Sequence, residues 1–243
     1  MLIVNADDWG GWPTATNAAF VCFQKGRISS VSAMVFMEDS DRAALIALDC
    51  GLNVGLHLNL NRRFTAKVPS TTLSQKHRRV ARFLETSKYA QLFYNPVLTN
   101  DFRDVFHAQL NEFIRLYGKA PTHFDGHQHM HLCTNMRIDG TIPAGQKMRR
   151  NFTFLPGQKS FLNRFYRALV DRGLLRRYRM TDYFFSLAQC LRHNQLSRVA
   201  DLAKHESVEL MTHPEVPDEL SFLMSSRFPE VFDGISINGY PQL

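Results

Sequence analysis

The chain has 243 residues, of which 44% are hydrophobic and 21% are charged, and its formal net charge is +7. This composition is typical of a folded protein and excludes a disordered or low-complexity chain. The sequence lacks both an apolar run of the roughly 20 residues that span a membrane and the pattern of a secretory signal. Its four cysteines are scattered without a CxxC pair, which favours free thiols and a cytoplasmic protein.

Apolar runs and helical patterns alternate over the first 60 residues. We predict strands at 2–5, 31–36 and 52–60, separated by helices at 14–25 and 39–48. Strands that alternate with helices at such short spacing are typical of parallel βα units. The sequence therefore predicts an α/β fold.

Residues 61–100 interrupt this alternation, because they are basic and contain two prolines. We expect a basic insertion here, with one short helix. Beyond it, an amphipathic pattern predicts a helix at 101–117, and a strand follows at 121–125. The remaining predicted elements are a strand at 147–154, a helix and a strand within 160–185, and a strand at 208–212. No internal repeat or linker divides the chain, so we expect a single domain over 1–243.

Basic residues concentrate in two stretches of the chain. Seven Lys and Arg residues and no acid lie between Arg62 and Arg82, and ten more lie between Lys147 and Arg179 against the single acid Asp171. Such local excess favours an anionic ligand, a phosphate-bearing substrate or a membrane surface. The alternative is a solvated basic face that keeps the protein soluble.

A cluster of histidines is the strongest chemical signal. His127, His129 and His131 alternate along the chain directly after His123 and Asp125. Whether this segment is extended or helical, several imidazoles converge in a small region. Burying an unpaired imidazole is costly, so the cluster predicts metal binding or acid–base chemistry. The spacing alone does not decide which histidine binds.

Titratable side chains also end three other predicted strands. Asp7 and Asp8 follow the first strand, His57 lies at the end of the third, and His213 ends the late strand. The carboxyl ends of parallel strands are where α/β enzymes build active sites. Helix capping by an aspartate and a structural role for His57 are the alternatives. A carboxylate with two imidazoles suits Zn²⁺ or a harder divalent ion in hydrolysis.

Four motifs, in chain order, cover residues 1–215: NADDWG at 5–10, GLHLN at 55–59, THFDGHQHMH at 122–131 and THP at 212–214. Together they resemble the YdjC-like carbohydrate deacetylases, the chitooligosaccharide deacetylase group. The resemblance implies an irregular (β/α) barrel related to polysaccharide deacetylases, which hydrolyses the N-acetyl group of an amino sugar and releases acetate. It also implies one divalent metal ion, Mg²⁺ or Zn²⁺, held by residues that match Asp8, His57 and His127.

The remaining roles follow from this hypothesis of metal-assisted amide hydrolysis. We expect Asp7 to act as the general base and His213 to protonate the leaving amine. We interpret His129 or His131 as a residue that orients a ligand, and Asp125 as an acceptor of an imidazole N–H. Further side chains expected near the ligands or the substrate are Asn59, Arg149 and Arg150.

The basic residues that follow His57 predict a substrate in which the N-acetyl sugar carries an anionic group, as in lipid- or nucleotide-linked sugars. A helix within 160–179 is basic and amphipathic, which suits an anionic membrane surface. Packing of its apolar face on the strands is the favoured interpretation. Two rival functions are a non-catalytic carbohydrate- or metal-binding barrel and a metal-dependent phosphoester hydrolase. We expect no nucleic-acid partner, and the sequence leaves peripheral membrane contact and a homo-oligomer open.

Overall fold

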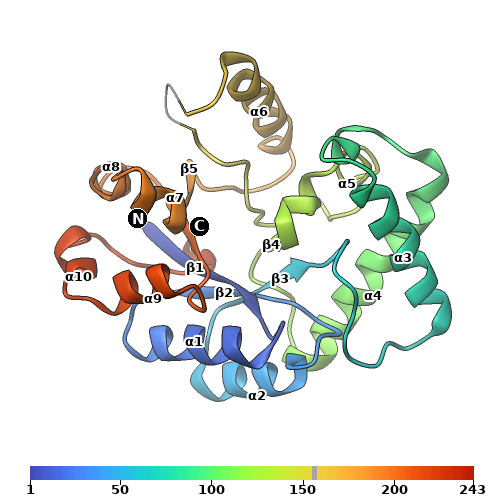
Figure 1. Ribbon diagram of the computed structural model, residues 1–243, viewed down its shortest axis with the longest axis horizontal. Coiled ribbons are helices and arrows are strands. Elements are labelled where there is room, and N and C mark those ends of the chain that lie inside the picture. Colours follow the sequence, from blue (N-terminus) through green and yellow to red (C-terminus); the bar gives the residue numbers. More distant parts are fainter. Residues whose placement is uncertain (155–157) are drawn as a thin grey trace.

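Six short strands form one parallel sheet in the order β4-β3-β2-β1-β6-β5 (Figure 1). This computed structural model describes residues 1–154 and 158–243. Almost every strand residue is buried, as expected for parallel strands covered on both faces. The strands are β1 (Leu2–Trp9), β2 (Ser30–Ala33), β3 (Val54–Leu58), β4 (Phe124–Gly126), β5 (Tyr183–Ser186) and β6 (Val208–Thr212).

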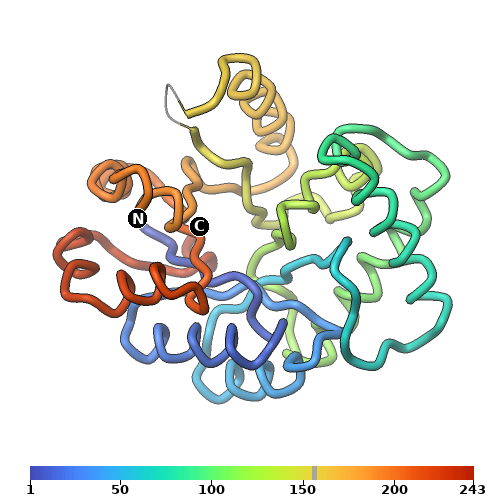
Figure 2. The backbone as a smooth tube through the Cα atoms, viewed as in Figure 1, coloured from blue at the N-terminus to red at the C-terminus, as the bar shows by residue number. Residues whose placement is uncertain are grey.

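The sheet curls, and helices cover its outer side (Figures 1 and 2). Helix α1 (Pro13–Gln24) packs on β1, and α4 (Thr99–Tyr117) packs on β3 and on α2 (Ser40–Cys50). The helices after β5 and β6 are α7 (Leu187–Arg192), α8 (Leu196–Ala203), α9 (Pro217–Met224) and α10 (Arg227–Val231). The predicted α/β fold of alternating strands and helices is therefore confirmed, in the form of a half-barrel.

The gap between the two edge strands, β4 and β5, is bridged by irregular backbone. Met148 makes an isolated parallel bridge with Phe124 of β4, and Lys147 makes another with Arg179. Farther along, the Thr153 amide donates to the carbonyl of Phe184 in β5 over 2.8 Å. The prediction of a strand over 147–154 is wrong, because the described backbone there forms only such single contacts.

The basic insertion contains more helix than its sequence suggested. Helix α3 (Thr71–Glu85) is followed by two short 3₁₀ turns, η1 (Ala90–Leu92) and η2 (Pro96–Leu98). Ser70 caps α3 by accepting a hydrogen bond from the Leu73 amide over 3.1 Å. The buried positions of α3 are Leu73, His77, Val80 and Leu84. The prediction of one short helix is wrong, because the basic residues between these positions masked a regular apolar stripe.

Two helices connect β4 with β5: α5 (Thr134–Ile138), which follows the 3₁₀ segment η3 (His127–Leu132), and α6 (Phe161–Leu174). The chain ends with the 3₁₀ turn η4 (Tyr240–Gln242), after residues 236–238 run beside the start of β1. Most buried apolar side chains of both halves of the sheet belong to one cluster. Among the residues that the structure describes, no helix is long and apolar enough to cross a membrane.

Candidate functional site

The site begins at an irregularity in the central strand. The pairing of β1 with β2 shifts register between Ala6 and Trp9, and the backbone of Asp8 has a φ of +62°. This left-handed conformation is costly for a residue other than glycine and is concentrated at functional sites. Both Asp7 and Asp8 are buried, yet they bond to different partners. The two adjacent carboxylates therefore belong to different parts of the site.

Asp8 lies against two histidines from the neighbouring strand ends. Its Oδ1 atom is 2.9 Å from Nδ1 of His127 and 3.4 Å from Nε2 of His57. One ligand atom from each of the three side chains lies within 4.8 Å of the others. Burial raises the pKa of Asp8, but the hydrogen bonds from His127 and His57 outweigh it and lower that pKa below its usual range. We call these three residues the Asp8 cluster.

Asp125 holds the far side of the His57 ring. The two residues are register partners on β3 and β4, and His57 Nδ1 donates to Asp125 Oδ1 over 2.9 Å. Ser32 donates to the other carboxylate oxygen over 2.7 Å. Burial lowers the pKa of His57, but the nearby carboxylates of Asp125 and Asp7 outweigh it and raise that pKa to about 10. The arrangement directs Nε2 of His57 towards Asp8.

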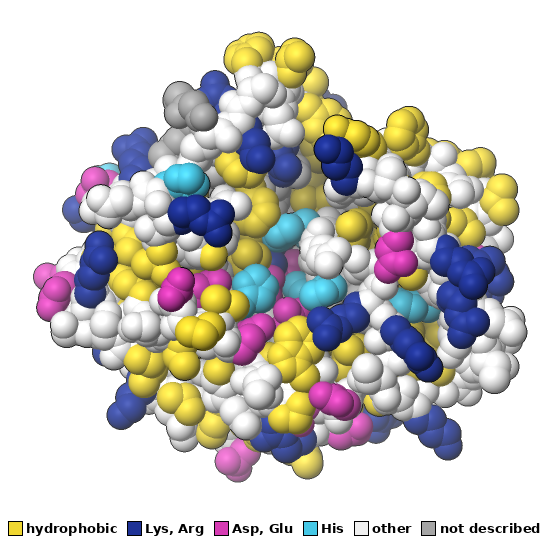
Figure 3. All heavy atoms as spheres, viewed as in Figure 1, with side chains coloured by type: hydrophobic (Ala, Val, Ile, Leu, Met, Phe, Trp, Pro, Cys, Tyr) yellow, Lys and Arg dark blue, Asp and Glu magenta, His cyan; other side chains and the backbone are white. Residues whose placement is uncertain are grey.

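The Asp8 cluster has the donor set of a divalent-metal site. One carboxylate and two imidazoles suit Zn²⁺ and related ions, which commonly leave positions open for water or substrate in catalytic sites. A histidine that binds a metal through one ring nitrogen usually donates its other N–H to a carboxylate or a carbonyl. Asp125 accepts such a hydrogen bond from His57. In Figure 3, histidine and acidic side chains gather in the centre of the face. These residues fit a metal ion.

A buried arginine organises the carboxylates beside the cluster. Arg149 donates to both oxygens of Asp7 over 2.7 Å each, and it lies 2.7 Å from Asp125 and from Glu209. Burial raises the pKa of Glu209 to about 7 although Arg149 opposes the shift. The Tyr240 hydroxyl donates to Glu209 over 2.5 Å. Because the Arg149 side chain is fully buried, it acts within the protein and does not face solvent.

His213 lies on the open side of the site. Its side chain is 30% exposed, and its Nε2 atom is 4.0 Å from Oδ2 of Asp8. Glu219 of α9 accepts hydrogen bonds from the His213 amide over 3.0 Å and from the Thr212 hydroxyl over 2.8 Å. Burial raises the pKa of Glu219. These bonds anchor the backbone of His213 and leave its imidazole accessible.

Four other predicted site residues have their partners outside the Asp8 cluster. Asn59 closes a turn by donating to the carbonyl of Arg62 over 2.7 Å, and Arg150 pairs with Asp171 over 2.9 Å. His131 Nε2 donates to the Arg149 carbonyl over 3.1 Å, and burial lowers the pKa of His131 to about 4. The His129 ring packs edge-on against the rings of Phe152 and Phe184.

Sequence reasoning missed Glu209, Glu219 and Tyr240. Glu209 did carry a signal, since it is the one charged residue in the apolar run of β6. An acid within a buried parallel strand needs a buried cation, and Arg149 is that cation. Glu219 and Tyr240 lie in ordinary helical and C-terminal contexts, so only the three-dimensional arrangement places them at the site.

Comparisons with known proteins identify relatives of this chain. A family model described as "YdjC-like protein" matches residues 1–234. A carbohydrate deacetylase from Mus musculus is 30% identical over 89% of this chain and 78% of its own length. A chitooligosaccharide deacetylase from Proteus mirabilis is 27% identical over 90% of this chain and 82% of its own length.

A solved structure shares the fold. It is a protein from Enterococcus faecalis V583 that has been proposed to cleave cellobiose phosphate. It superposes with a TM-score of 0.69 over 99% of this chain and 97% of its own, at 17% sequence identity. At that identity, the likeness establishes the architecture alone.

Proposed function

The chain belongs to the YdjC-like protein family, and we propose that it is a metal-dependent carbohydrate N-deacetylase, which hydrolyses the N-acetyl group of an amino sugar and releases acetate. Relatives named carbohydrate deacetylase and chitooligosaccharide deacetylase support this reaction class. The observation that carries the proposal is the Asp8 cluster, with Asp125 behind His57, at the carboxyl edge of the sheet.

Asp8, His57 and His127 would hold one divalent ion. Two imidazoles in the donor set favour zinc over magnesium, which prefers oxygen ligands and bound water. When bound, such an ion polarises a carbonyl oxygen and lowers the pKa of a coordinated water. The chain's own contribution is to orient the ligands through Asp125 and to keep the cluster largely buried.

We assign the general base to Asp7. Arg149 donates to both of its oxygens, and Asn5 donates to Oδ1 over 3.0 Å, so the carboxylate has one fixed orientation. One Asp7 oxygen lies within 4.8 Å of ligand atoms of His57 and Asp125. Asp7 would take a proton from the attacking water at this position. Asp7→Asn should keep the bound metal and reduce turnover roughly 10²–10⁴-fold.

We assign the general acid to His213. Its imidazole is the most exposed of the three beside Asp8, and Glu219 fixes its backbone. It would donate a proton to the nitrogen of the sugar as the C–N bond breaks. His213→Ala should retain the metal and lose roughly 10²–10⁴-fold in turnover, and His213→Asn should fold equally well and stay equally slow.

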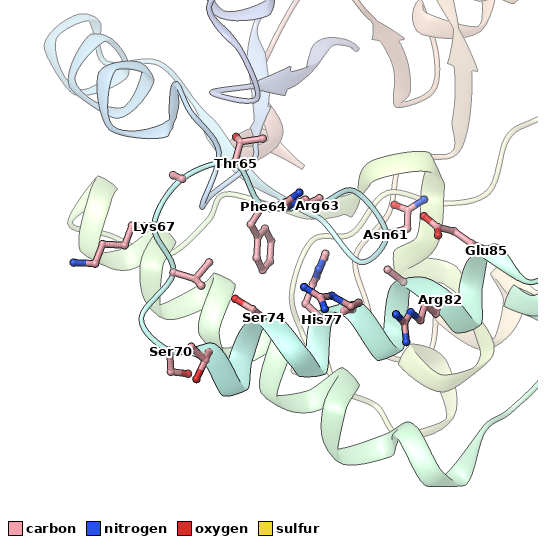
Figure 4. A pocket seen from close by; sticks show the side chains of 15 residues that line it. Asn61, Arg63, Phe64, Thr65, Lys67, Ser70, Ser74, His77, Arg82 and Glu85 are labelled. Atoms are coloured by element: carbon pink, nitrogen blue, oxygen red, sulfur yellow. The ribbon is translucent and has the colours of Figure 1, made fainter.

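The basic insertion supports an anionic group on the substrate. Lys76 and Arg79 pair with acids of α4, Asp104 and Asp101. Four other basic residues line a pocket of about 840 Å³, shown in Figure 4: Arg63, Lys67, Arg78 and Arg82. This pocket also includes Asn61, whose side chain donates to Gln128, the neighbour of His127, over 2.7 Å. An anion bound there would lie close to Gln128 and its neighbour His127.

The deciding experiment measures acetate and phosphate release in parallel on N-acetylglucosamine oligomers and on their phosphorylated forms. We expect acetate release that stops after chelation and returns when a divalent ion is added. Phosphate release without acetate would instead support a phosphoester hydrolase. Metal binding without either product would support a non-catalytic barrel. Arg82→Gln should raise KM for the phosphorylated form alone, with the exposed Arg198→Gln as the matched control.

A further inference from the structure

Large apolar side chains face solvent in two neighbouring segments. Of the eighteen exposed large hydrophobic residues that the structure describes, five lie in residues 89–97 and five in α6. The five in the first segment are Tyr89, Leu92, Phe93, Tyr94 and Val97, and the five in α6 are Phe161, Leu162, Phe165, Tyr166 and Leu169. Together they form what we call the apolar surface. A concentration of this kind marks an interaction site in a protein of this size.

The apolar face of α6 does not pack on the strands. The five apolar residues of its exposed face are 42–75% accessible, and the helix buries only Asp171 and Leu174. The packed barrel helix favoured from the sequence is therefore wrong for this segment. In Figure 1, α6 stands apart from the sheet, and in Figure 3 hydrophobic side chains lie at the outer end of this region, at the top of the view.

The two segments lie side by side around one pocket. Tyr89 and Leu92 line the same 300 Å³ pocket as Tyr166 and Val170 of α6. Arg137 of α5 donates to the Tyr166 hydroxyl over 3.3 Å and links the two sides. His129, two residues beyond His127, also lines this pocket. The pocket between the two segments therefore includes the residues that directly follow His127, namely Gln128 and His129.

The charges around α6 have one sign. Between Lys159 and Arg179 the chain has seven basic residues and one acid. That acid, Asp171, is buried and bound to Arg150 and Asn151. Arg172 of α6 is exposed and Arg164 and Arg167 are partly buried, so the helix presents cations without an exposed acid. Exposed aromatic and leucine side chains together with arginines are typical of helices that lie in the interface of an anionic bilayer.

We propose that the apolar surface docks on an anionic phospholipid bilayer, with α6 lying in the headgroup region. A second copy of this chain is a poorer occupant, because two α6 helices facing each other would bring like charges together. Anionic headgroups instead attract the arginines. Each basic residue near the membrane surface adds about 1 kcal/mol to the free energy of binding. Docking would hold the mouth of the catalytic site beside the membrane.

Cosedimentation with vesicles tests this proposal without any assay of deacetylation. The full chain should bind vesicles that contain about 30% phosphatidylglycerol, and binding should weaken several-fold between about 50 and about 500 mM salt. Neutral phosphatidylcholine vesicles should bind far less. The triple variant Phe161→Ser, Leu162→Ser and Phe165→Ser should lose about tenfold or more in affinity, because these side chains supply the inserted apolar area.

A matched control separates this effect from a general loss of apolar surface. The double variant Leu45→Ser and Leu48→Ser changes exposed residues of α2 and should bind anionic vesicles as the native chain does. Circular dichroism should show that both variants fold. Native protein that fails to bind anionic vesicles would overturn the proposal, and so would equal losses in the two variants. A native dimer that the triple variant converts to a monomer, with no vesicle binding, would show that a second copy occupies the surface.

Discussion

The carboxyl edge of the sheet and the surface of α6 depart from the usual distribution of side chains in opposite directions. At the sheet edge, Arg149 and three carboxylates are buried, whereas on α6 five large apolar side chains face solvent. Burying charge costs free energy, and exposed apolar area contributes no hydrophobic stabilisation. Both regions therefore depart from what folding alone favours, and we attribute each departure to function.

The two regions differ in whether the chain itself supplies partners for their unusual side chains. In the buried network around Arg149, every guanidinium nitrogen has a carboxylate partner. On α6, the exposed aromatic and leucine side chains lack an equivalent cover from the residues that the structure describes. The buried network is complete within the chain, whereas the apolar surface needs an external partner. Variants in the first region should therefore change stability or chemistry, and variants in the second should change binding alone.

The largest effect is expected at the Asp8 cluster. Asp8→Ala, His57→Ala and His127→Ala should each lose most bound metal and nearly all activity, because three ligands cannot be reduced to two without loss of affinity. Metal content and acetate release would be measured on the same preparations. His193→Ala changes an exposed histidine and should retain both properties. Full metal content in His57→Ala would show that the site is wrongly assigned.

The next largest effect is expected from Arg149→Met. It removes the cation from a buried group of carboxylates, and such unpaired buried charge costs about 3–5 kcal/mol of stability. Urea unfolding would measure the change. Arg42→Met breaks an ion pair with Asp39 whose arginine is partly exposed, and it should cost about 1 kcal/mol or less. Equal effects in the two variants would contradict the role given to the buried network.

Two buried histidines have pKa values that are shifted in opposite directions. Carboxylates raise the pKa of His57 to about 10, whereas burial lowers the pKa of His77, which stacks on Phe64, to about 4. The unfolded chain therefore takes up a proton at His77 before the folded chain does. The contribution of neutral His77 to the free energy of unfolding is therefore complete above pH 6.5. It is lost as the pH falls towards 4.

The variant His77→Phe measures that contribution. Between pH 7 and pH 5 the native chain should lose about 2 kcal/mol more stability than His77→Phe, since each pKa unit corresponds to about 1.4 kcal/mol. Urea midpoints at the two pH values give the difference. Other buried histidines such as His123, whose pKa burial lowers to about 3, titrate equally in both proteins and cancel. Parallel losses in the two proteins would contradict the burial of a neutral His77.

The smallest effect is expected on the apolar surface. Leu162→Ser should change the free energy of unfolding by no more than about 0.5 kcal/mol, because the side chain is exposed. The buried Phe102→Ala of α4 should cost about 3–5 kcal/mol by comparison. A large loss in Leu162→Ser would show that α6 packs against the rest of the chain in solution, and the docking proposal would then lose its basis.

Short-range patterns predicted the parts of this protein that depend on neighbouring residues. The alternation of apolar strands and amphipathic helices indicated parallel βα units, and β6 lies at the predicted residues 208–212. The titratable residues Asp8, His57 and His127 were recognisable because each follows or ends a strand. Parallel strands bring such ends to one edge, and the structure places these three side chains within ligand distance of one another.

Other features depended on contacts between distant parts of the chain. Arg149 was expected near the substrate, but its partners Asp7 and Glu209 lie 142 and 60 residues away, and only the folded sheet shows that it is buried. The buried positions of α3 pack against α4, and this contact between two helices is not visible in the local pattern. The segment 147–154 was predicted as a strand, yet in the gap between β4 and β5 its backbone forms only isolated bridges and single hydrogen bonds.

Local patterns identify the strands that carry the candidate ligands, because strand pattern and chemical type depend on neighbouring residues. Which charges are buried together, and which apolar face stays uncovered, depends on the folded chain. An amphipathic pattern such as that of α6 has the same form whether its apolar side meets a sheet or solvent. Burial depends on what the rest of the chain places opposite each side chain, and that is a property of the whole fold.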